Sequence, residues 1–456
     1  MQKIYTVADT PLGWRHWWIV FVSSLGQFVG CAVATIAGVI IPMLAITENG
    51  DLPSWMQGLI GAADLLGIVF GSLIFGKLTD RFGYLPFFRL CPAIIILASL
   101  PAIFFPYVGV LIPSLFAIGF GIGGEYSLDS DYVSELMPTD KKMMMLGIVK
   151  TGASLGNIVA AAIAFLLIIH WDDASNWPDL MWIITITGAV MLLTRLYFFE
   201  SPKWLMEHGQ PQKAAYNVKK FLGSNVILAS NAVPPAAAAK TPEEENLTVI
   251  AFCRKYWNRV MLSGVPWACE GLGVYGIGVF IPVLVMALGI THQGIDADRM
   301  MHVAESVKST FWISCIMLPG FLIGVWLTSR KINYCRLQSM TFWASSLSLL
   351  LLLVSYKFHW PVWISLVAFM GFELFLNLGP HLVTYLLPPD IYPVEIRGQG
   401  TGIAAAIGKA GAVAGVFIIP LLLKVGGGVL VLAVSAGVMA AGALVTTVYG
   451  RKVYKK

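Results

Sequence analysis

Charged residues are scarce in this chain. Asp, Glu, Lys and Arg make up 12% of its 456 residues, whereas hydrophobic residues make up 57%. Soluble domains usually carry about 25% charged residues, and a water-soluble fold could not hide this much apolar surface. The shortage of charge therefore excludes an ordinary soluble protein and indicates a membrane protein.

Cysteine is also scarce, and the motifs of enzymes are missing. The six cysteines have no spacing typical of a metal site, and we expect them to be reduced thiols. No paired nucleophile and base stands out, and no glycine loop that would cradle a phosphate is evident. The sequence thus predicts that the protein is not an enzyme and has no cofactor or metal.

Long apolar runs take the place of these features. A helix crosses the hydrocarbon core of a membrane with about 20 residues, and the chain has twelve runs suited to that role. We therefore expect an all-α polytopic membrane protein with twelve transmembrane helices. The predicted spans are residues 17–46, 56–76, 87–106, 108–136, 143–170, 179–199, 258–289, 306–328, 339–356, 361–388, 398–423 and 428–449.

The chain repeats itself across its two halves. An acid three residues before a proline follows an apolar run twice, at residues 135–138 and 390–393, and a basic residue comes next each time. Repeats of this kind are typical of transporters built from related halves. We expect two pseudo-symmetric six-helix bundles, residues 1–200 and 257–456. Residues 201–256 between them are predicted to form a cytoplasmic amphipathic helix and a linker.

Basic residues are unevenly spread over the predicted loops. Cytoplasmic loops accumulate Lys and Arg near span ends, and here alternate loops carry them while the others are acidic or nearly free of positive charge. Both chain ends fall on the basic side, so we expect a protein of the cell (inner) membrane with cytoplasmic termini. The net charge of +5 then reflects topology and gives no reason to expect a nucleic-acid partner.

Four segments resemble those of a known family. Residues 76–83, Gly-Lys-Leu-Thr-Asp-Arg-Phe-Gly, are similar to the loop signature of the major facilitator superfamily, and residues 324–330 form a weaker copy. Residues 200–205 and 393–398 resemble the segments that follow the sixth and tenth spans in sugar porters. The resemblance implies the major facilitator fold and alternating access. The expected conformational gate comprises Gly76, Asp80, Arg81, Gly83, Glu135, Arg330, Glu395 and Arg397.

Local patterns in the spans are most similar to phosphate:proton symporters and their organic-ion relatives. These patterns are Glu125-Tyr126, the pair Trp267 and Tyr275, and Lys409 after a glycine. The chain also departs from the family patterns. The first span lacks the acid of those symporters, and the seventh span lacks the glutamines of sugar porters.

Ionisable side chains inside a membrane are costly and tend to face a cavity or one another. Glu125 and Asp129 are four residues apart, so they share one helix face, which we expect to line the cavity. With Glu270, they are the predicted proton-coupling residues. The predicted substrate-binding residues are Tyr126, Lys150, Trp267, Tyr275, Glu373, Asn377, His381 and Lys409.

Two further charges allow structural interpretations. Asp64 either contacts substrate or pairs with a lysine of the fifth or eleventh span, and both remain open. Arg195 lies near a span end, where anchoring at the membrane interface is the default.

The sequence as a whole predicts a proton-coupled symporter that works by alternating access, functions as a monomer in the lipid bilayer, and binds protons and a small polar solute. We favour an anion such as phosphate or an organic acid. A cation, a neutral solute such as a sugar, and a transporter-like receptor that no longer transports remain alternatives.

Overall fold

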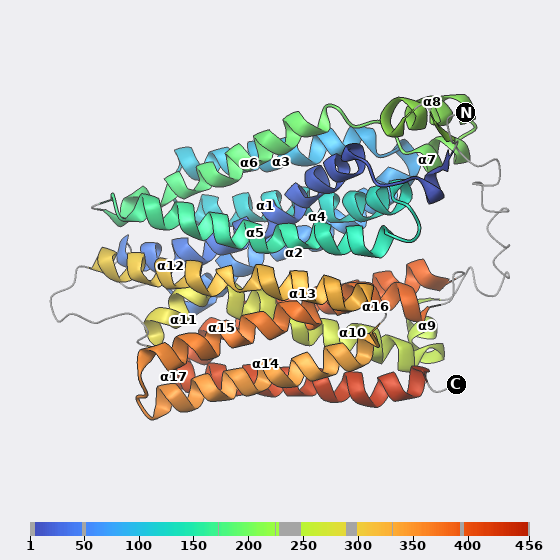
Figure 1. Ribbon diagram of the computed structural model, residues 1–456. Coiled ribbons are helices and arrows are strands. Elements are labelled where there is room, and N and C mark those ends of the chain that lie inside the picture. The colour runs from blue at the N-terminus through green and yellow to red at the C-terminus, as the bar shows by residue number, and fades with distance from the viewer. Residues whose placement is uncertain are drawn as a thin grey trace.

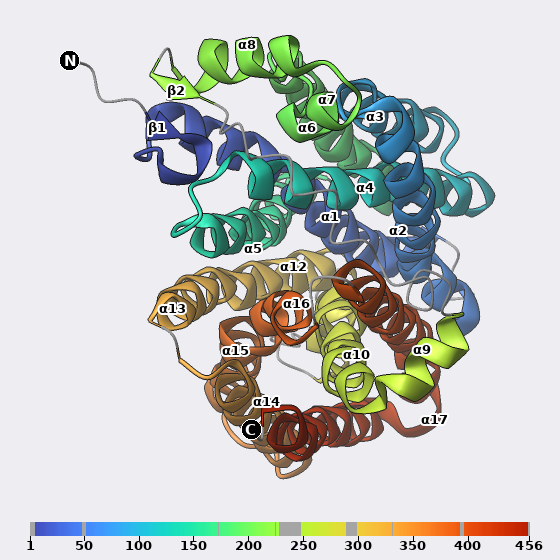
Figure 2. The same ribbon diagram turned by 90° about the vertical axis from the view of Figure 1, so that its right-hand side faces the viewer.

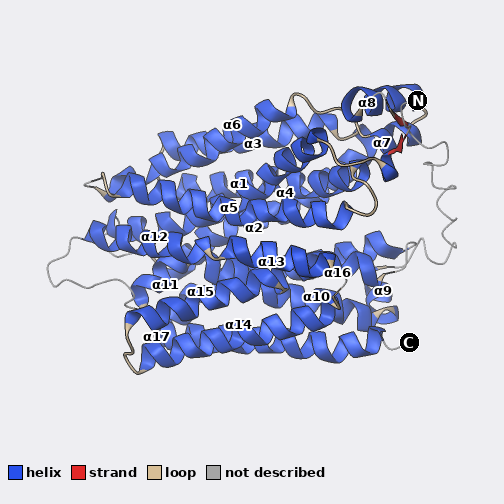
Figure 3. Cartoon of the chain, in the orientation of Figure 1, coloured by secondary structure: helices blue, strands red, loops and turns tan. Residues whose placement is uncertain are grey.

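The structure is a computed structural model that describes residues 5–47, 52–171, 173–223, 225–227, 248–288, 299–330, 332–392 and 396–454. Nearly all of these residues are helical, and long helices run side by side from one end of the molecule to the other (Figures 1 and 3). The predicted all-α class is confirmed.

The first six spans follow one another with short connections. A 3-10 turn, η2 (Ala174–Leu180), leads into the last of them. The helices are α1 (Trp14–Thr47), α2 (Ser54–Phe82), α3 (Leu85–Phe104), α4 (Val108–Leu136), α5 (Lys142–Ile168) and α6 (Met181–Arg195).

The remaining spans are more broken than the sequence predicted. α10 and α11 form one span bent by 66°, and α17 is two spans joined at Gly427, whose positive φ of 61° interrupts the helix. Ten helices of the described chain are long and apolar enough to cross a membrane, the bent pair makes an eleventh span, and the division of α17 at Gly427 makes twelve, as predicted. The elements are α10 (Trp257–Gly271), the π-helix η3 (Leu272–Ile277), α11 (Ile281–Ala287), α12 (Arg299–Cys315), α13 (Met317–Ser329), α14 (Tyr334–Lys357), α15 (Val362–Leu378), α16 (Pro380–Ile391) and α17 (Arg397–Tyr454).

Short elements gather at the end of the bundle that carries both termini (Figure 1). The predicted amphipathic helix is present as two helices, α7 (Pro202–Glu207) and α8 (Pro211–Leu222), because Gly209 adopts a φ of 71° between them. A parallel pairing of β1 (Tyr5–Thr6) with β2 (Val226–Ile227) was not predicted. η1 (Val7–Asp9) and α9 (Val249–Lys255) complete the elements. The predicted Pro/Ala-rich linker at residues 231–245 lies outside the described residues.

The helices form two groups, α1 to α6 and α10 to α17, which face each other across the molecule (Figure 2). They contact closely at the end away from the termini. A Cβ on Gly38 would lie 1.8 Å from the carbonyl oxygen of Val279, and one on Gly61 would lie 2.7 Å from a Val416 methyl. The two groups are therefore closed against each other at that end.

Candidate functional site

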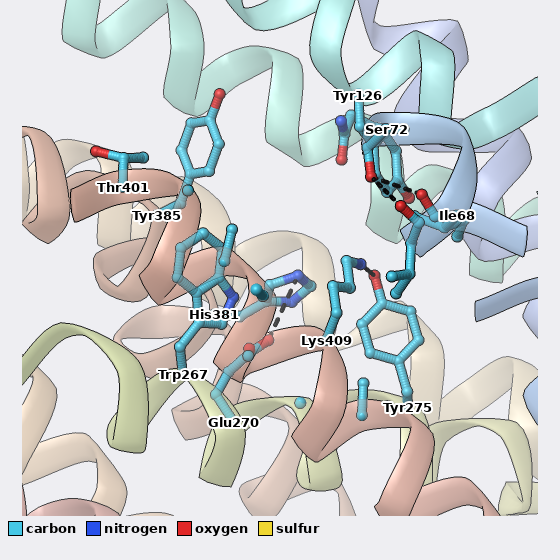
Figure 4. A pocket seen from close by; sticks show the side chains of 18 of the residues that line it. Ile68, Ser72, Tyr126, Trp267, Glu270, Tyr275, His381, Tyr385, Thr401 and Lys409 are labelled. Carbon is cyan, nitrogen blue, oxygen red and sulfur yellow. Dashed lines mark hydrogen bonds and ion pairs between the residues drawn. The ribbon is translucent and has the colours of Figure 1, made fainter. Parts of the chain in front are cut away.

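A cavity of about 360 Å³ lies between the two helix groups near the middle of the spans (Figure 4). Seven of the eleven residues predicted for proton coupling and substrate binding meet there, although they are far apart in the sequence. The predicted residues that line it are Tyr126, Lys150, Trp267, Glu270, Tyr275, His381 and Lys409. Sequence analysis missed the polar lining residues Gln27, Ser72, Tyr385 and Thr401.

One lysine of the cavity comes from α5. Lys150 donates a hydrogen bond to the side-chain oxygen of Gln27 at 3.0 Å. Its ammonium group also lies 5.5 Å from the ring centre of Tyr126 and 5.3 Å from that of Tyr385. A cation over the face of an aromatic ring is stabilised by the ring quadrupole. These contacts hold the charge at the cavity surface without neutralising it.

The second lysine comes from α17 in the other helix group. The Lys409 ammonium lies 3.4 Å from the Tyr275 hydroxyl, 4.7 Å from the Tyr275 ring centre and 5.2 Å from the ring centre of Tyr126. Tyr275 is carried by the π-helix η3, and such turns occur frequently at functional sites. Gly408 leaves room for the neighbouring indole, because a Cβ there would lie 2.6 Å from Trp267.

A chain of polar side chains supports the far wall of the cavity. Glu270 lies 3.8 Å from Nε2 of His381, whose Nδ1 lies 3.1 Å from the Asn377 side-chain oxygen. Asn377 donates in turn to the Glu373 carboxylate at 3.2 Å. Glu373, Asn377 and His381 thus form one polar stripe, of which only His381 lines the cavity. Glu373 and Asn377 were predicted to bind substrate, but in this conformation both are buried and lie outside the lining.

The prediction that Glu125 and Asp129 face the cavity is also wrong. Both carboxylates pair with the Arg195 guanidinium, Asp129 at 2.8 Å, and all three side chains are buried between α4 and α6. Gly26 makes room for this cluster, because a Cβ there would lie 2.4 Å from Asp129 Oδ2. Tyr126 points into the cavity from the adjacent position, since consecutive helical residues lie about 100° apart.

The prediction that Arg195 anchors the protein at the membrane interface is wrong as well. It is 0% exposed and does not anchor the protein at an interface. Its guanidinium also lies 4.9 Å from the ring centre of Phe88. A buried arginine needs a carboxylate partner, and two acids one turn apart on α4 were the signal that could have identified it.

Asp64 pairs with neither lysine in the part of the chain that the structure describes. Its side chain is buried, and both carboxylate oxygens have no hydrogen-bond partner there. Lys150 and Lys409 instead face the cavity. The expected ion pair across the helices is therefore absent from this conformation.

Two glutamates tie the predicted gate loops together at the end with the termini. Gly83 ends α2 with a φ of 87°, and the Glu200 carboxylate beside it accepts hydrogen bonds from the backbone N–H groups of Tyr84 at 2.7 Å and Leu85 at 3.2 Å. Glu135 accepts from the Ser201 hydroxyl at 2.7 Å and from the first turn of α7. Sequence analysis did not single out Glu200.

The other predicted gate residues contribute less to the contacts between these loops. The Arg81 and Arg330 guanidinium groups lie over the adjacent rings of Phe82 and Trp326, and Gly76 is open, with room for a Cβ. Glu395 lies outside the described residues, as do the side chains of Asp80 and Arg397. Among the described residues, no group of three or more His, Cys, Asp or Glu side chains could hold a metal ion.

Comparisons with known proteins agree with this geometry. The family described as "Sugar (and other) transporter" matches residues 28–449. The inner membrane metabolite transport protein YgcS of Escherichia coli is 25% identical over 96% of this chain and 92% of its own length. A repressible high-affinity phosphate permease of Neurospora crassa is 24% identical over 90% and 78%.

The fold is also that of a solved transporter. The structure of the major facilitator superfamily proton:xylose symporter XylE bound to 6-bromo-6-deoxy-D-glucose superposes with a TM-score of 0.70 and 16% sequence identity, covering 94% of each chain. The predicted twelve-helix major facilitator fold, with its two six-helix bundles, is confirmed.

Proposed function

This chain belongs to the family of sugar and other transporters, and we propose that it is a proton-coupled symporter for a small anion. Transport by an integral membrane protein follows from the family and the fold. The family is one of transporters and not of enzymes. The anion, the proton and the direction of transport are the proposed parts.

The charge of the central cavity supports an anion. Lys150 and Lys409 line it from opposite helix groups, and Glu270 is its one acidic lining residue in the described chain. The other intramembrane acids that we considered, Glu125, Asp129, Glu373 and Asp64, lie outside the lining. With His381 neutral, the lining carries a net positive charge, which attracts an anion and repels a cation.

The rings of the cavity favour an organic anion over a small inorganic one. Tyr126, Tyr275, Tyr385 and Trp267 form much of the lining. Aromatic walls stack on a flat apolar body, while the two lysines pair with its carboxylate. An aromatic carboxylate such as nicotinate satisfies both requirements. The similarity to a phosphate permease keeps inorganic phosphate as a second anion to test.

Glu270 is the residue to which we assign the proton. Lys150 and Lys409 act on its carboxylate across the cavity. An anion that binds the lysines neutralises them and adds negative charge, so the protonated form of Glu270 is then favoured. Anion and proton therefore bind together. We assign no coupling role to Glu125 and Asp129, because both carboxylates pair with Arg195 and neither lines the cavity.

Alternating access then moves both ligands. The two helix groups are closed at the end away from the termini, and the central cavity lies on the terminal side of that contact. We infer a cell (inner) membrane location with cytoplasmic termini, since basic residues concentrate at that end and YgcS is an inner membrane protein. One chain supplies the whole cavity, which supports a functional monomer.

Uptake into proteoliposomes tests this proposal. The purified full-length protein is reconstituted, and radiolabelled nicotinate, inorganic phosphate, choline and xylose are compared with and without an inward proton gradient. We expect the gradient to accelerate uptake of an anion, nicotinate foremost, beyond the rate in protein-free vesicles. Accumulation of choline in the vesicles would contradict the proposal. Anion uptake at the same rate with and without the proton gradient would contradict it too.

A further inference from the structure

Asp64 in α2 is the intramembrane acid that nothing in the cavity accounts for. Its side chain is 1% exposed, and its carboxylate has no side-chain hydrogen-bond partner in the described chain, where the backbone N–H groups of Asp64 and Leu65 are its local polar neighbours. The other buried acids each have a polar side chain as neighbour. Glu125 and Asp129 share Arg195, Glu270 lies beside His381, and Glu373 accepts from Asn377.

The close packing of α2 against α4 leaves no room for a further polar partner beside Asp64 on that side. A Cβ on Gly119 of α4 would lie 2.0 Å from the backbone oxygen of Asp64. The backbones of α2 and α4 therefore touch at this level. An isolated carboxylate in such a place is costly, so a proton on Asp64 is the simplest way to compensate its charge in this conformation.

Asp64 interacts electrostatically with three titratable groups on the helices that pack against α2. They are Cys31 of α1, Tyr126 of α4 and Lys409 of α17, and α3 supplies none in the described chain. Lys409 is the one cation among them, and it belongs to the opposite helix group. Tyr126 and Lys409 also line the central cavity. The charge on Asp64 is thus linked to the occupancy of the cavity and to the position of the other half.

We propose that Asp64 is a second proton-binding residue of the transport cycle, with Lys409 as its alternating counter-ion. This inference rests on the proposed function. While Lys409 is held at the cavity, by Tyr275 in this conformation or by a bound anion, the Asp64 carboxyl keeps its proton. When the anion has left and the two halves move, the Lys409 ammonium approaches and compensates Asp64, the O–H bond breaks, and the proton passes to water in the cavity. Asp64 lies one turn from Ile68 and two turns from Ser72, both of which line the cavity.

Asp64 lies in a region to which the first span contributes no acid, because residues 17–46 contain none. From α1, this region receives Cys31 and Gly30, which lies close to the Tyr126 hydroxyl. Asp64 supplies a carboxylate there from α2. It is placed to bind a proton without contacting the substrate itself.

Asp64→Asn, which keeps the shape and removes the acid, tests the proposal in the full-length protein. Infrared difference spectra of the protein in lipid, recorded between acidic and alkaline buffer, report the carbonyl stretch of a buried protonated carboxyl. We expect Asp64→Asn to lose one such band. Glu305→Gln, which removes an exposed acid of α12, is the matched control and should retain it.

Transport assays add a second readout. Asp64→Asn should retain nicotinate counterflow, which needs no net proton movement, and should lose most of the acceleration that the proton gradient gives to wild-type uptake. If the variant does not fold, Lys409→Gln serves instead. Without the Lys409 ammonium as counter-ion, Asp64 should hold its proton more tightly, and its carbonyl band should persist to higher pH.

The possible outcomes separate this inference from the proposed function. An unchanged infrared titration in Asp64→Asn, or gradient-driven uptake equal to that of wild type, overturns the role of Asp64. Wild-type protein that carries neither nicotinate nor phosphate overturns the proposed function, and the infrared titration still decides whether Asp64 exchanges a proton.

Discussion

At the scale of single residues, the two cavity lysines should carry anion affinity. Lys150→Gln and Lys409→Gln each remove one charge-assisted contact, which is worth about 1.5–3 kcal/mol, or roughly tenfold to a hundredfold in KM. Nicotinate uptake by each variant in proteoliposomes measures the loss. Lys308→Gln, which changes an exposed lysine of α12, should transport like wild type.

The direction of the effect separates the possible substrates. If both lysine variants transport nicotinate with the KM of wild type, the two lysines do not select for negative charge. Equal loss in Lys308→Gln would mean that the assay reports general damage instead of a site.

Arg195 should matter for stability more than for binding. Removal of one partner from a buried ion pair costs about 3–5 kcal/mol, so Arg195→Met should lower the thermal denaturation temperature clearly. The triple variant Arg195→Met, Glu125→Gln, Asp129→Asn leaves no unpaired charge and should recover much of that loss. A single variant as stable as wild type would show that the cluster is not an ion pair in the membrane.

Residue patterns in the spans predicted part of the cavity lining, because polar and aromatic side chains inside a membrane tend to face a shared cavity. Trp267 and Tyr275 are eight residues apart on one span and meet the same cavity, and Tyr126 and Lys409 do so from two other spans. The facing of Glu125 and Asp129 could not be predicted, because helix periodicity shows that two residues share a face but not which neighbour that face meets. Arg195 is 66 residues from Asp129, a distance that local spacing does not bridge.

At the scale of elements, the contact of α1 with the bend between η3 and α11 should control closure. Gly38→Ala places a Cβ that would lie 1.8 Å from the Val279 carbonyl oxygen, so the two groups cannot close fully at the end away from the termini. We expect slower uptake and greater reactivity of the thiol in Ala45→Cys, on the same end of α1, toward a membrane-impermeant reagent. Gly109→Ala, which has open space around it, is the control.

The result that would contradict this role of Gly38 can be stated for the same two measurements. Unchanged thiol reactivity and uptake in Gly38→Ala would show that this contact does not close the transporter.

The breaks within spans were not predictable from hydropathy. The apolar run continues through the π-helix η3 and the bend that follows it, and also through Gly379 and Pro380 between α15 and α16. Glycine and proline permit such breaks, but neighbouring helices decide where they occur. Span lengths, in contrast, follow from the thickness of the bilayer and were predicted closely.

At the scale of the whole molecule, the repeated halves placed one lysine on each side of a shared cavity. The twelve spans and the fold could be predicted from apolar runs and from the repeated loop segments, because both are fixed by the membrane. The solute could not be predicted from charge alone, since five intramembrane acids favoured a cation, and the structure places only one of these five, Glu270, at the cavity. The account therefore depends on the charge of that cavity and on its link to protons.

Calorimetric titration of nicotinate into the purified protein, in buffers of different ionisation enthalpy, measures that link directly. The dependence of the observed heat on the buffer gives the protons taken up with each bound anion. The account predicts net proton uptake in wild type and a large reduction of that uptake in Glu270→Gln. Anion binding without proton uptake, or proton uptake unchanged in Glu270→Gln, would contradict it.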